Sequence, residues 1–185
     1  MQNINQEKEL KKFFDDYLLD KKVALKFIKR LMKGRLTRDE NPESHFSTYF
    51  AAYDLSARQI FIGLHKKAGL WLFNGGHIDK GELIRQTLTR EINEEWGIDS
   101  NDLEIKSPAF LTITEIDNPS KQSCRIHYDL WHFISVDKNY FNPEKEKLLQ
   151  EFHEAGWKSL KEAKDLIRDR NTLKAIDFIE KNYFV

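Results

Sequence analysis

The sequence predicts one α/β domain of the α+β kind, in which a β-sheet packs against helices and a helical pair precedes it. Three observations support this prediction. Apolar residues recur at helical spacing near the N-terminus, alternating stretches rich in β-branched and aromatic residues recur from residue 45 to residue 136, and a charged helical segment at 83–96 interrupts them. A chain of 185 residues with 40% hydrophobic side chains is long and apolar enough to bury one core.

Composition limits the kinds of partner. Thirty basic side chains balance thirty acidic ones, so no overall field attracts a long nucleic acid or an anionic membrane. Charges interrupt every apolar run near the N-terminus, which predicts neither a secretory signal nor a membrane span. The single cysteine, Cys124, excludes an internal disulfide framework and leaves no zinc-ligand spacing such as CxxC. We expect a cytoplasmic protein in which Cys124, in a predicted turn, is incidental.

Two short amphipathic helices are predicted at the N-terminus, each with apolar residues at i, i+3, i+4, i+7 and i+8. The first set is Leu10, Phe13, Phe14, Tyr17 and Leu18, and the second, before Gly34, is Ala24, Phe27, Ile28, Leu31 and Met32. We expect residues 1–35 to be a helical extension that covers either the main core or a neighbouring subunit, so a homodimer contact stays open. Residues 36–185 are the predicted main domain, with 36–44 as the linker.

The other predicted elements follow in chain order. HFSTYFAAYD and RQIFIGLHK are strands, KKAGLWLFNGG is a turn and a short strand that enters a glycine-rich loop, and residues 83–96 are a helix that Gly97 ends. AFLTITEID and CRIHYDLWHFISV are strands joined by the turn NPSKQS. In EFHEAGWKSLKEAKDLIRDR, Ser159 and Glu162 form a capping box that begins a helix, and TLKAIDFIEKN is the last helix.

Residues 75–98, GGHIDKGELIRQTLTREINEEWGI, contain an unfavourable charge pattern. Glu91, Glu94 and Glu95 share one face of the predicted helix, where like charges repel. Carboxylates on a rigid helix are the hard oxygen ligands that Mg²⁺ or Mn²⁺ prefers, and a cation would cancel the repulsion. The guanidinium of Arg90 could hold one carboxylate in place. The plain alternative is a solvated helix face with ordinary ion pairs.

The stretch resembles the signature of the Nudix hydrolases: a glycine, five residues, Glu, seven residues, Arg-Glu, an aliphatic residue, one residue, Glu-Glu, one residue, Gly and an aliphatic residue. Every fixed position is filled, by Gly76, Glu82, Arg90, Glu91, Ile92, Glu94, Glu95, Gly97 and Ile98. The resemblance implies the Nudix fold, an α/β/α sandwich with a mixed sheet, for the part after the helical pair. One departure is Asn74, where many members carry proline, and we expect it to matter little.

The resemblance implies that water and a divalent cation cleave a diphosphate linkage in a small nucleoside diphosphate derivative. A bound cation acidifies water and offsets charge on phosphoryl oxygens during in-line attack. By position, the implied ligands of Mg²⁺ or Mn²⁺ are Glu91, Glu94 and Glu95, with Glu82 as an outer-sphere or second-metal ligand and the Gly76 carbonyl completing the shell. Arg90 is expected to orient the glutamates.

The base that deprotonates the attacking water is less defined. In this family it is a glutamate of the box or one from a later loop, so we expect Glu94 or Glu95 to act, with Glu151 and Glu154 as the loop alternatives. His77 would either donate to a substrate phosphate or cap the loop. His127 and His132 lie on opposite faces of one strand and are expected to be structural. Four strand aromatics would stack a base or belong to the core, namely Trp71, Phe73, Phe110 and Trp131.

Three other functions compete. Isopentenyl-diphosphate isomerase shares the scaffold, but its chemistry needs a cysteine where this chain has Gly75. A non-catalytic nucleotide sensor would typically lose box glutamates, and this chain keeps all of them. Removal of an RNA cap is disfavoured by net neutrality and by the absence of a basic tract. The substrate itself cannot be read from the box, because specificity lies in strands and loops outside it.

Overall fold

The computed structural model describes residues 2–17, 19–116 and 123–184. Leu18 of the first helical pattern and residues 118–122 of the predicted NPSKQS turn lie outside the described residues. The helices are α1 Gln2–Asp16, α2 Lys21–Leu31, α3 Ile84–Trp96, η1 Ser100–Asp102, α4 Lys145–Glu151, α5 Leu160–Leu166 and α6 Arg170–Tyr183. The strands are β1 Ser44–Asp54, β2 Gln59–His65, β3 Leu70–Leu72, β4 Asn74–His77, β5 Phe110–Glu115, β6 Ile126–Ser135 and β7 Phe152–Ser159.

Seven strands form one mixed sheet, in which the path β3-β2-β1-β6-β5 is joined by β4 beside β1 and by β7 beside β2. The long central strands β1 and β6 run parallel, and their register extends from Ser44↔Ile126 to Tyr53↔Ser135. The first half of β1 pairs on its other side with β4, antiparallel, so that Thr48 lies opposite Gly76. The strand that carries Gly75 and Gly76 is therefore fixed to the centre of the sheet.

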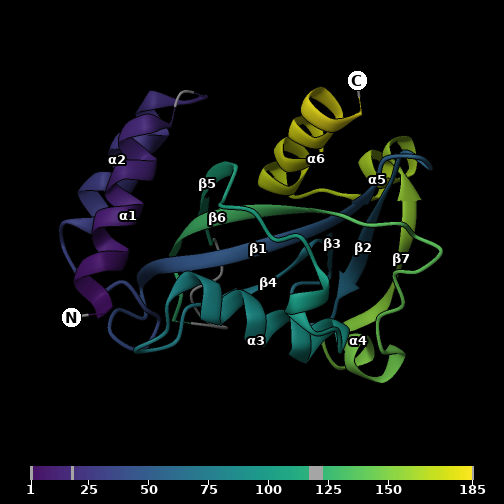
Figure 1. Cartoon of the computed structure of the whole chain (residues 1–185), viewed down its shortest axis with the longest axis horizontal. Helices are drawn as coiled ribbons and strands as arrows, with labels where there is room; N and C mark the ends of the chain where they lie inside the picture. Colours follow the sequence, from purple (N-terminus) through teal and green to yellow (C-terminus); the bar gives the residue numbers. More distant parts are fainter. Residues whose placement is uncertain (1, 18, 117–122, 185) are drawn as a thin grey trace.

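Helices cover both faces of the sheet (Figure 1). Alternate residues of β1 point to opposite sides, as the pleat requires. Ala51 and Tyr53 belong to the cluster that includes Ala175 and Ile176 of α6, whereas Phe50 belongs to the cluster of α3. The predicted α/β/α sandwich with a mixed sheet is confirmed.

The N-terminal helices pack on the sheet. Phe27 of α2 is fully buried, and its ring lies 5.7 Å from that of Phe46 and 5.2 Å from that of Tyr128 on the central strands. The buried guanidinium of Arg30 donates to the Ser44 carbonyl where β1 begins. The pair thus covers part of the main core. The division at residue 35 and a homodimer contact remain predictions.

The segment after β6 differs from the prediction. Residues 145–159 form α4 and β7, whereas the sequence had indicated a loop with a turn at Gly156. Gly156 instead lies opposite Ile62 in the antiparallel pair of β2 and β7. The glycine-rich loop at 74–77 is likewise a strand, β4. Strands β4 and β7 were missed for one reason, because each pairs with a strand far away in the chain, β1 or β2, and carries little local signal of its own.

Helix ends follow the local sequence closely. At α3 the side chain of Gln86 accepts from the N–H of Leu83 at 2.7 Å, and Gly97 at φ 68° ends the helix as predicted. The predicted capping box of α5 is present, since Ser159 N–H donates to Glu162 at 2.8 Å and its hydroxyl accepts in return at 3.3 Å. Among the described helices, none has the length and apolar character needed to cross a membrane. The cytoplasmic location remains a prediction.

The buried ring of His132 should make stability depend on pH. Burial lowers its pKa to about 4, and its Nδ1 lies 2.9 Å from the Lys106 carbonyl. The unfolded chain therefore binds a proton more readily between pH 6.5 and pH 4, so stability present above pH 6.5 is lost as pH falls. We expect a loss of about 2 kcal/mol between pH 7 and pH 5 from this residue. The free energy of unfolding, measured by urea unfolding at several pH values, should depend less steeply on pH in His132→Gln than in the parent chain. An equal dependence on pH in the two proteins would contradict the assignment.

Candidate active site

Arg90 lies at the centre of the box on α3. Its Nε and Nη2 donate to the two oxygens of Glu82 at 2.8 and 2.9 Å. Its Nη1 donates to Glu91 at 2.7 Å and to Glu94 at 3.2 Å. One guanidinium thus contacts three box carboxylates, and its hydrogen bonds lower the pKa of Glu82 to about 2. Arg90 is therefore placed to fix the glutamates in position.

One box carboxylate, Glu95, is buried, and a second, Glu91, is largely covered. The Glu95 side chain accepts a hydrogen bond from the Asn74 amide, and burial raises its pKa to about 8 in spite of that bond. Burial also raises the pKa of Glu91, whose side chain is 12% exposed. Burying carboxylates is unfavourable unless their charge is compensated. A divalent cation would supply this compensation, and the carboxylate oxygens are ligands that suit Mg²⁺ or Mn²⁺.

Gly76 makes room for the Glu91 carboxylate. A Cβ atom at residue 76 would lie 1.8 Å from Glu91 Oε1, far inside van der Waals contact. Any residue other than glycine would displace this carboxylate. Gly76 of β4 and the Glu91 carboxylate therefore lie against each other and form what we call the glycine cradle. This arrangement fits a cation bound between main-chain and carboxylate oxygens.

Asn74 has a larger part in the site than the sequence suggested. Its side chain is buried and donates to Glu95, the most buried glutamate of the box. We expected this departure from proline to matter little, yet it adds a contact that proline, with no side-chain amide, cannot make. No pattern in the sequence links position 74 to position 95, so only the fold reveals the contact.

Three box glutamates line a large open cavity, namely Glu91, Glu94 and Glu95, together with Gly76. The same cavity is lined by six basic residues from other elements, which are Arg38, Lys67, Lys147, Arg168, Arg170 and Lys174. Carboxylates and basic groups thus lie around one space. Such a cavity suits an anionic ligand that bridges a metal ion and cationic side chains.

The two alternative bases lie in different places. Glu151, at the end of α4, lines the cavity, and its carboxylate lies 3.6 Å from His65 Nε2 and 3.7 Å from Lys67 Nζ. Glu154 is exposed on β7 and is not among the lining residues. Neither belongs to a loop. The structure brings Glu151 to the cavity and leaves Glu154 outside its lining.

The predicted aromatic and histidine positions are divided between core and cavity. Phe73 and Trp131 are buried in the core beneath α6, and Trp71 and Phe110 pack against the same cluster. Trp131 also contributes to the cavity lining. His127 and His132 lie apart, as predicted. The interpretation of these aromatics as core residues is confirmed.

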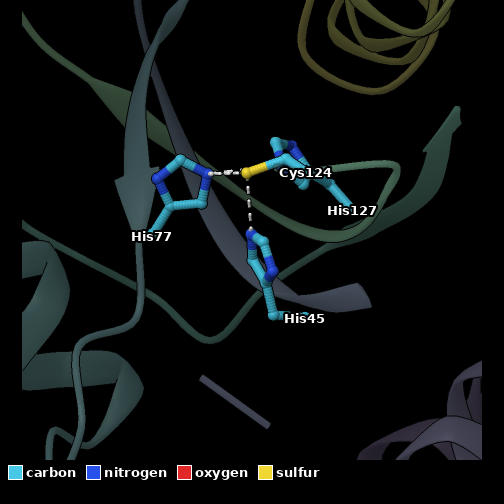
Figure 2. Close-up of side chains that lie close together, drawn as sticks. All are labelled: His45, His77, Cys124 and His127. Carbon is cyan, nitrogen blue, oxygen red and sulfur yellow. Dashed lines mark hydrogen bonds between the residues drawn. The ribbon is translucent and has the colours of Figure 1, made fainter. Parts of the chain in front are cut away.

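Sequence reasoning missed one group of residues. Cys124, expected to be incidental, lies beside His45, His77 and His127 (Figure 2). The pair Cys124 and His127, with two residues between them, was a short ligand-like spacing that a search for CxxC does not detect. His77 thus contacts other side chains of the chain, so it does more than cap a loop.

Arg90→Lys should weaken the site without unfolding it. A lysine ammonium is a point charge that cannot bridge three carboxylates as the guanidinium does. We expect kcat/KM to fall about 10- to 100-fold, as for other groups that orient metal ligands. Steady-state kinetics with a metal titration would measure the change. Arg85→Lys, on the same helix but directed to the Ile105 carbonyl, is the matched control; equal activity of the two variants would contradict the orienting role.

A mixed sheet between helices, with a helix that presents an arginine-bound set of glutamates beside a glycine cradle, defines a Nudix-type enzyme. A family model described as NUDIX domain matches residues 55–177. The chain therefore belongs to the Nudix family, and the predicted class, a Nudix-type pyrophosphohydrolase, is confirmed. No match was found among curated protein sequences.

Solved structures show the same fold at low identity. The Escherichia coli dihydroneopterin triphosphate pyrophosphohydrolase is 17% identical, with a TM-score of 0.61 over 75% of this chain and 94% of that one. A Caenorhabditis elegans Ap4A hydrolase in a binary complex is 16% identical, with a TM-score of 0.60 over 74% and 95%. A NUDIX family hydrolase from Clostridium perfringens is 20% identical, with a TM-score of 0.53 over 74% and 98%.

Membership of the family defines the general chemistry. Nudix hydrolases act on pyrophosphate bonds of small nucleotide substrates and generally use divalent metal ions. About three quarters of the chain aligns with each of these structures.

Proposed function

We propose that this chain hydrolyses the diphosphate linkage of a nucleoside diphosphate derivative in a reaction that depends on Mg²⁺ or Mn²⁺. The observation that carries the proposal is the cavity wall, which presents Glu91, Glu94 and Glu95 while six basic residues lie around the same space. Arg90 holds two of these glutamates, Glu91 and Glu94. Acidic groups would hold the cation and basic groups would hold the phosphates. The cavity has a volume of about 1900 Å³, which leaves room for groups on both sides of a diphosphate.

In this proposal Glu91, Glu94 and Glu95 are the cation ligands, together with the Gly76 carbonyl. The burial of Glu95, the largely covered position of Glu91 and the glycine cradle support the assignment. When bound, the cation supplies electrostatic stabilisation of the charge that develops on the phosphoryl oxygens. Glu82 differs from the others, because both of its oxygens accept from Arg90 and it does not line the cavity. An outer-sphere role through Arg90 suits it best.

The reaction proposed is attack of a water oxygen on phosphorus, with cleavage of the bridging P–O bond and transfer of the water proton to a carboxylate. We assign this base to Glu94 or Glu95. Glu94 suits this role because its side chain is 57% exposed and lines the cavity. Among the described residues, its carboxylate forms a salt bridge only with Arg90, at 3.2 Å. Glu151 is already close to His65 and Lys67, and Glu154 lies outside the lining.

A product-release panel tests the proposal. ADP-ribose, dinucleoside polyphosphates, nucleotide sugars and nucleoside triphosphates would be incubated with Mg²⁺, Mn²⁺ or EDTA, and the products separated by liquid chromatography with phosphate detection. We expect a nucleoside monophosphate or diphosphate to appear only with metal. If the folded protein released no product from any compound of the panel, the assignment to nucleoside diphosphate derivatives would be contradicted. That result would favour a nucleotide sensor or a hydrolase whose substrate is an unrelated diphosphate.

The base assignment has its own comparison. Glu151→Gln and Glu154→Gln should each retain kcat within a few-fold, whereas a glutamine at position 94 or 95 should lower it by orders of magnitude. If kcat of Glu151→Gln or Glu154→Gln fell as far as kcat of the box variants, the assignment of the base to Glu94 or Glu95 would be overturned.

A further inference from the structure

Three neighbouring strands each deliver one histidine to the same point. His45 is the second residue of β1, His127 is the second residue of β6, and these two are register partners in the parallel pair. His77 ends β4 on the other side of β1, where it lies opposite Ser47. The three ring centroids form a triangle with sides of 4.8, 4.9 and 4.9 Å. Cys124, just before β6, completes the group (Figure 2).

Three of the six separations between the donor atoms are close to those around a tetrahedral ion. With metal–nitrogen distances of about 2.0 Å and a metal–sulfur distance of about 2.3 Å, a tetrahedron has N···N edges of about 3.3 Å and N···S edges of about 3.5 Å. His77 Nε2 lies 3.3 Å from His127 Nε2. Cys124 Sγ lies 3.7 Å from His45 Nε2 and 3.9 Å from His77 Nε2. All four donor atoms lie within 4.8 Å of one another.

The protonation states of the group also suit a metal. The Nδ1 of His45 lies 2.9 Å from the Asn41 carbonyl, which fixes the proton there and leaves Nε2 free to bind. Arg38 Nη1 approaches His77 Nδ1 at 3.5 Å, but this side chain is exposed and can turn away.

We propose that His45, His77, Cys124 and His127 form a second metal site, for Zn²⁺ or an ion of similar preference, separate from the carboxylates of the box. Neutral imidazoles with one thiolate are the soft, tetrahedral donor set that Zn²⁺ favours, whereas Mg²⁺ prefers oxygen. Four protein ligands leave no open position, so the site is structural. The thiol proton leaves to solvent when the thiolate binds the ion.

Such a site would hold the active site in shape. His77 directly follows Gly76, and its carbonyl accepts from Arg90 Nη2 at 3.1 Å. His45 and Cys124 are buried behind the cavity wall, whereas His77 and His127 line the cavity. An ion bound to all four would tie the end of β4, and with it the glycine cradle, to β1 and β6. The alternative is a hydrogen-bonded group of neutral side chains with no ion.

Spectroscopy of the full chain distinguishes these cases without any substrate. Protein treated with EDTA, dialysed and kept reduced would be titrated with Co²⁺, with Zn²⁺ added afterwards as competitor. We expect one tetrahedral Co²⁺ per chain, seen as strong visible absorption and a thiolate-to-cobalt charge-transfer band, both removed by one equivalent of Zn²⁺. Co²⁺ at the oxygen ligands of the box would absorb weakly and add no such band. Zn²⁺ at 100 times its dissociation constant should raise the melting temperature by about 5–10 °C.

Variants identify the ligands. Cys124→Ser, which is nearly isosteric, should lose the charge-transfer band, and His127→Gln should lower Co²⁺ affinity by more than about 100-fold, beyond the usual effect of an outer-shell group. Two control variants, His132→Gln and Glu94→Gln, should show the same Co²⁺ spectrum as the parent chain. His132 is a buried histidine of β6 outside the group, and Glu94 belongs to the box. The proposal is overturned if the parent chain shows no tetrahedral spectrum with Co²⁺, even if Zn²⁺ raises its melting temperature through the box carboxylates. A charge-transfer band that persists in Cys124→Ser would overturn the four-ligand assignment.

Discussion

Replacing Gly76 with alanine is expected to lower metal-dependent turnover by about 100-fold or more, a loss typical of a misplacement near 1 Å at a reacting centre. The new Cβ would lie 1.8 Å from Glu91 Oε1 and 2.1 Å from Glu91 Cδ. The carboxylate is the end of a flexible side chain, so it can move and relieve the clash. The loss should therefore fall on activity and metal affinity, while the melting temperature changes little.

Gly156→Ala is the matched control for this variant. No heavy atom lies within 4 Å of a Cβ built at residue 156, and the backbone there is ordinary strand. Kinetics, Mn²⁺ binding by electron paramagnetic resonance and thermal unfolding would be measured for both variants. Full turnover of Gly76→Ala would show that the position of Glu91 is unimportant. A large drop in its melting temperature would show that the close approach serves folding rather than the site.

Replacing Glu94 with glutamine is expected to lower kcat by about 10²- to 10⁴-fold, whether the residue binds the cation, accepts the water proton or does both. The amide keeps the size of the side chain but can neither accept a proton nor balance a cation. The side chain is 57% exposed, so folding should be unaffected. Stopped assays over a wide range of Mg²⁺ concentration would separate the two roles, because excess metal rescues a weakened ligand but not a lost base.

Glu104→Gln is the control for the substitution itself. This glutamate is 76% exposed and contacts only Lys106 among the salt bridges of the described residues. If Glu94→Gln and Glu104→Gln turn over equally, the glutamates of α3 are an ordinary charged surface, as the plain interpretation of the charge pattern holds.

The local features of the fold were predictable because their causes are local. Helix α3, its stop at Gly97 and the start of α5 at Ser159 depend on residues within a few positions of one another. The box is of this kind too, because its spacing along one helix already places Glu91, Glu94 and Glu95 together. A single sequence therefore sufficed to indicate the family, the sheet between helices and the acidic wall of the cavity.

The features that escaped prediction depend on contacts between distant segments. Strand β7 exists because β2 pairs with it, and the Asn74 amide meets Glu95 only after β4 lies beside α3. The group around Cys124 is the extreme case, since His45 lies 79 residues from the sulfur and His77 lies 47 residues from it. Spacing rules for metal ligands assume short loops, so they do not detect ligands that adjacent strands bring together.

The parallel pairing of β1 and β6 also affects the order in which parts of the chain fold. Ser47 of β1 meets Asp129 of β6 across 82 residues of chain, and every box residue lies in the interval between them. Contacts of such long range form late, because the entropy of closing the loop opposes them. A nascent chain that ends after α3 would contain the complete box yet lack β6 and much of the cavity. The motif alone is thus no measure of activity in a truncated chain.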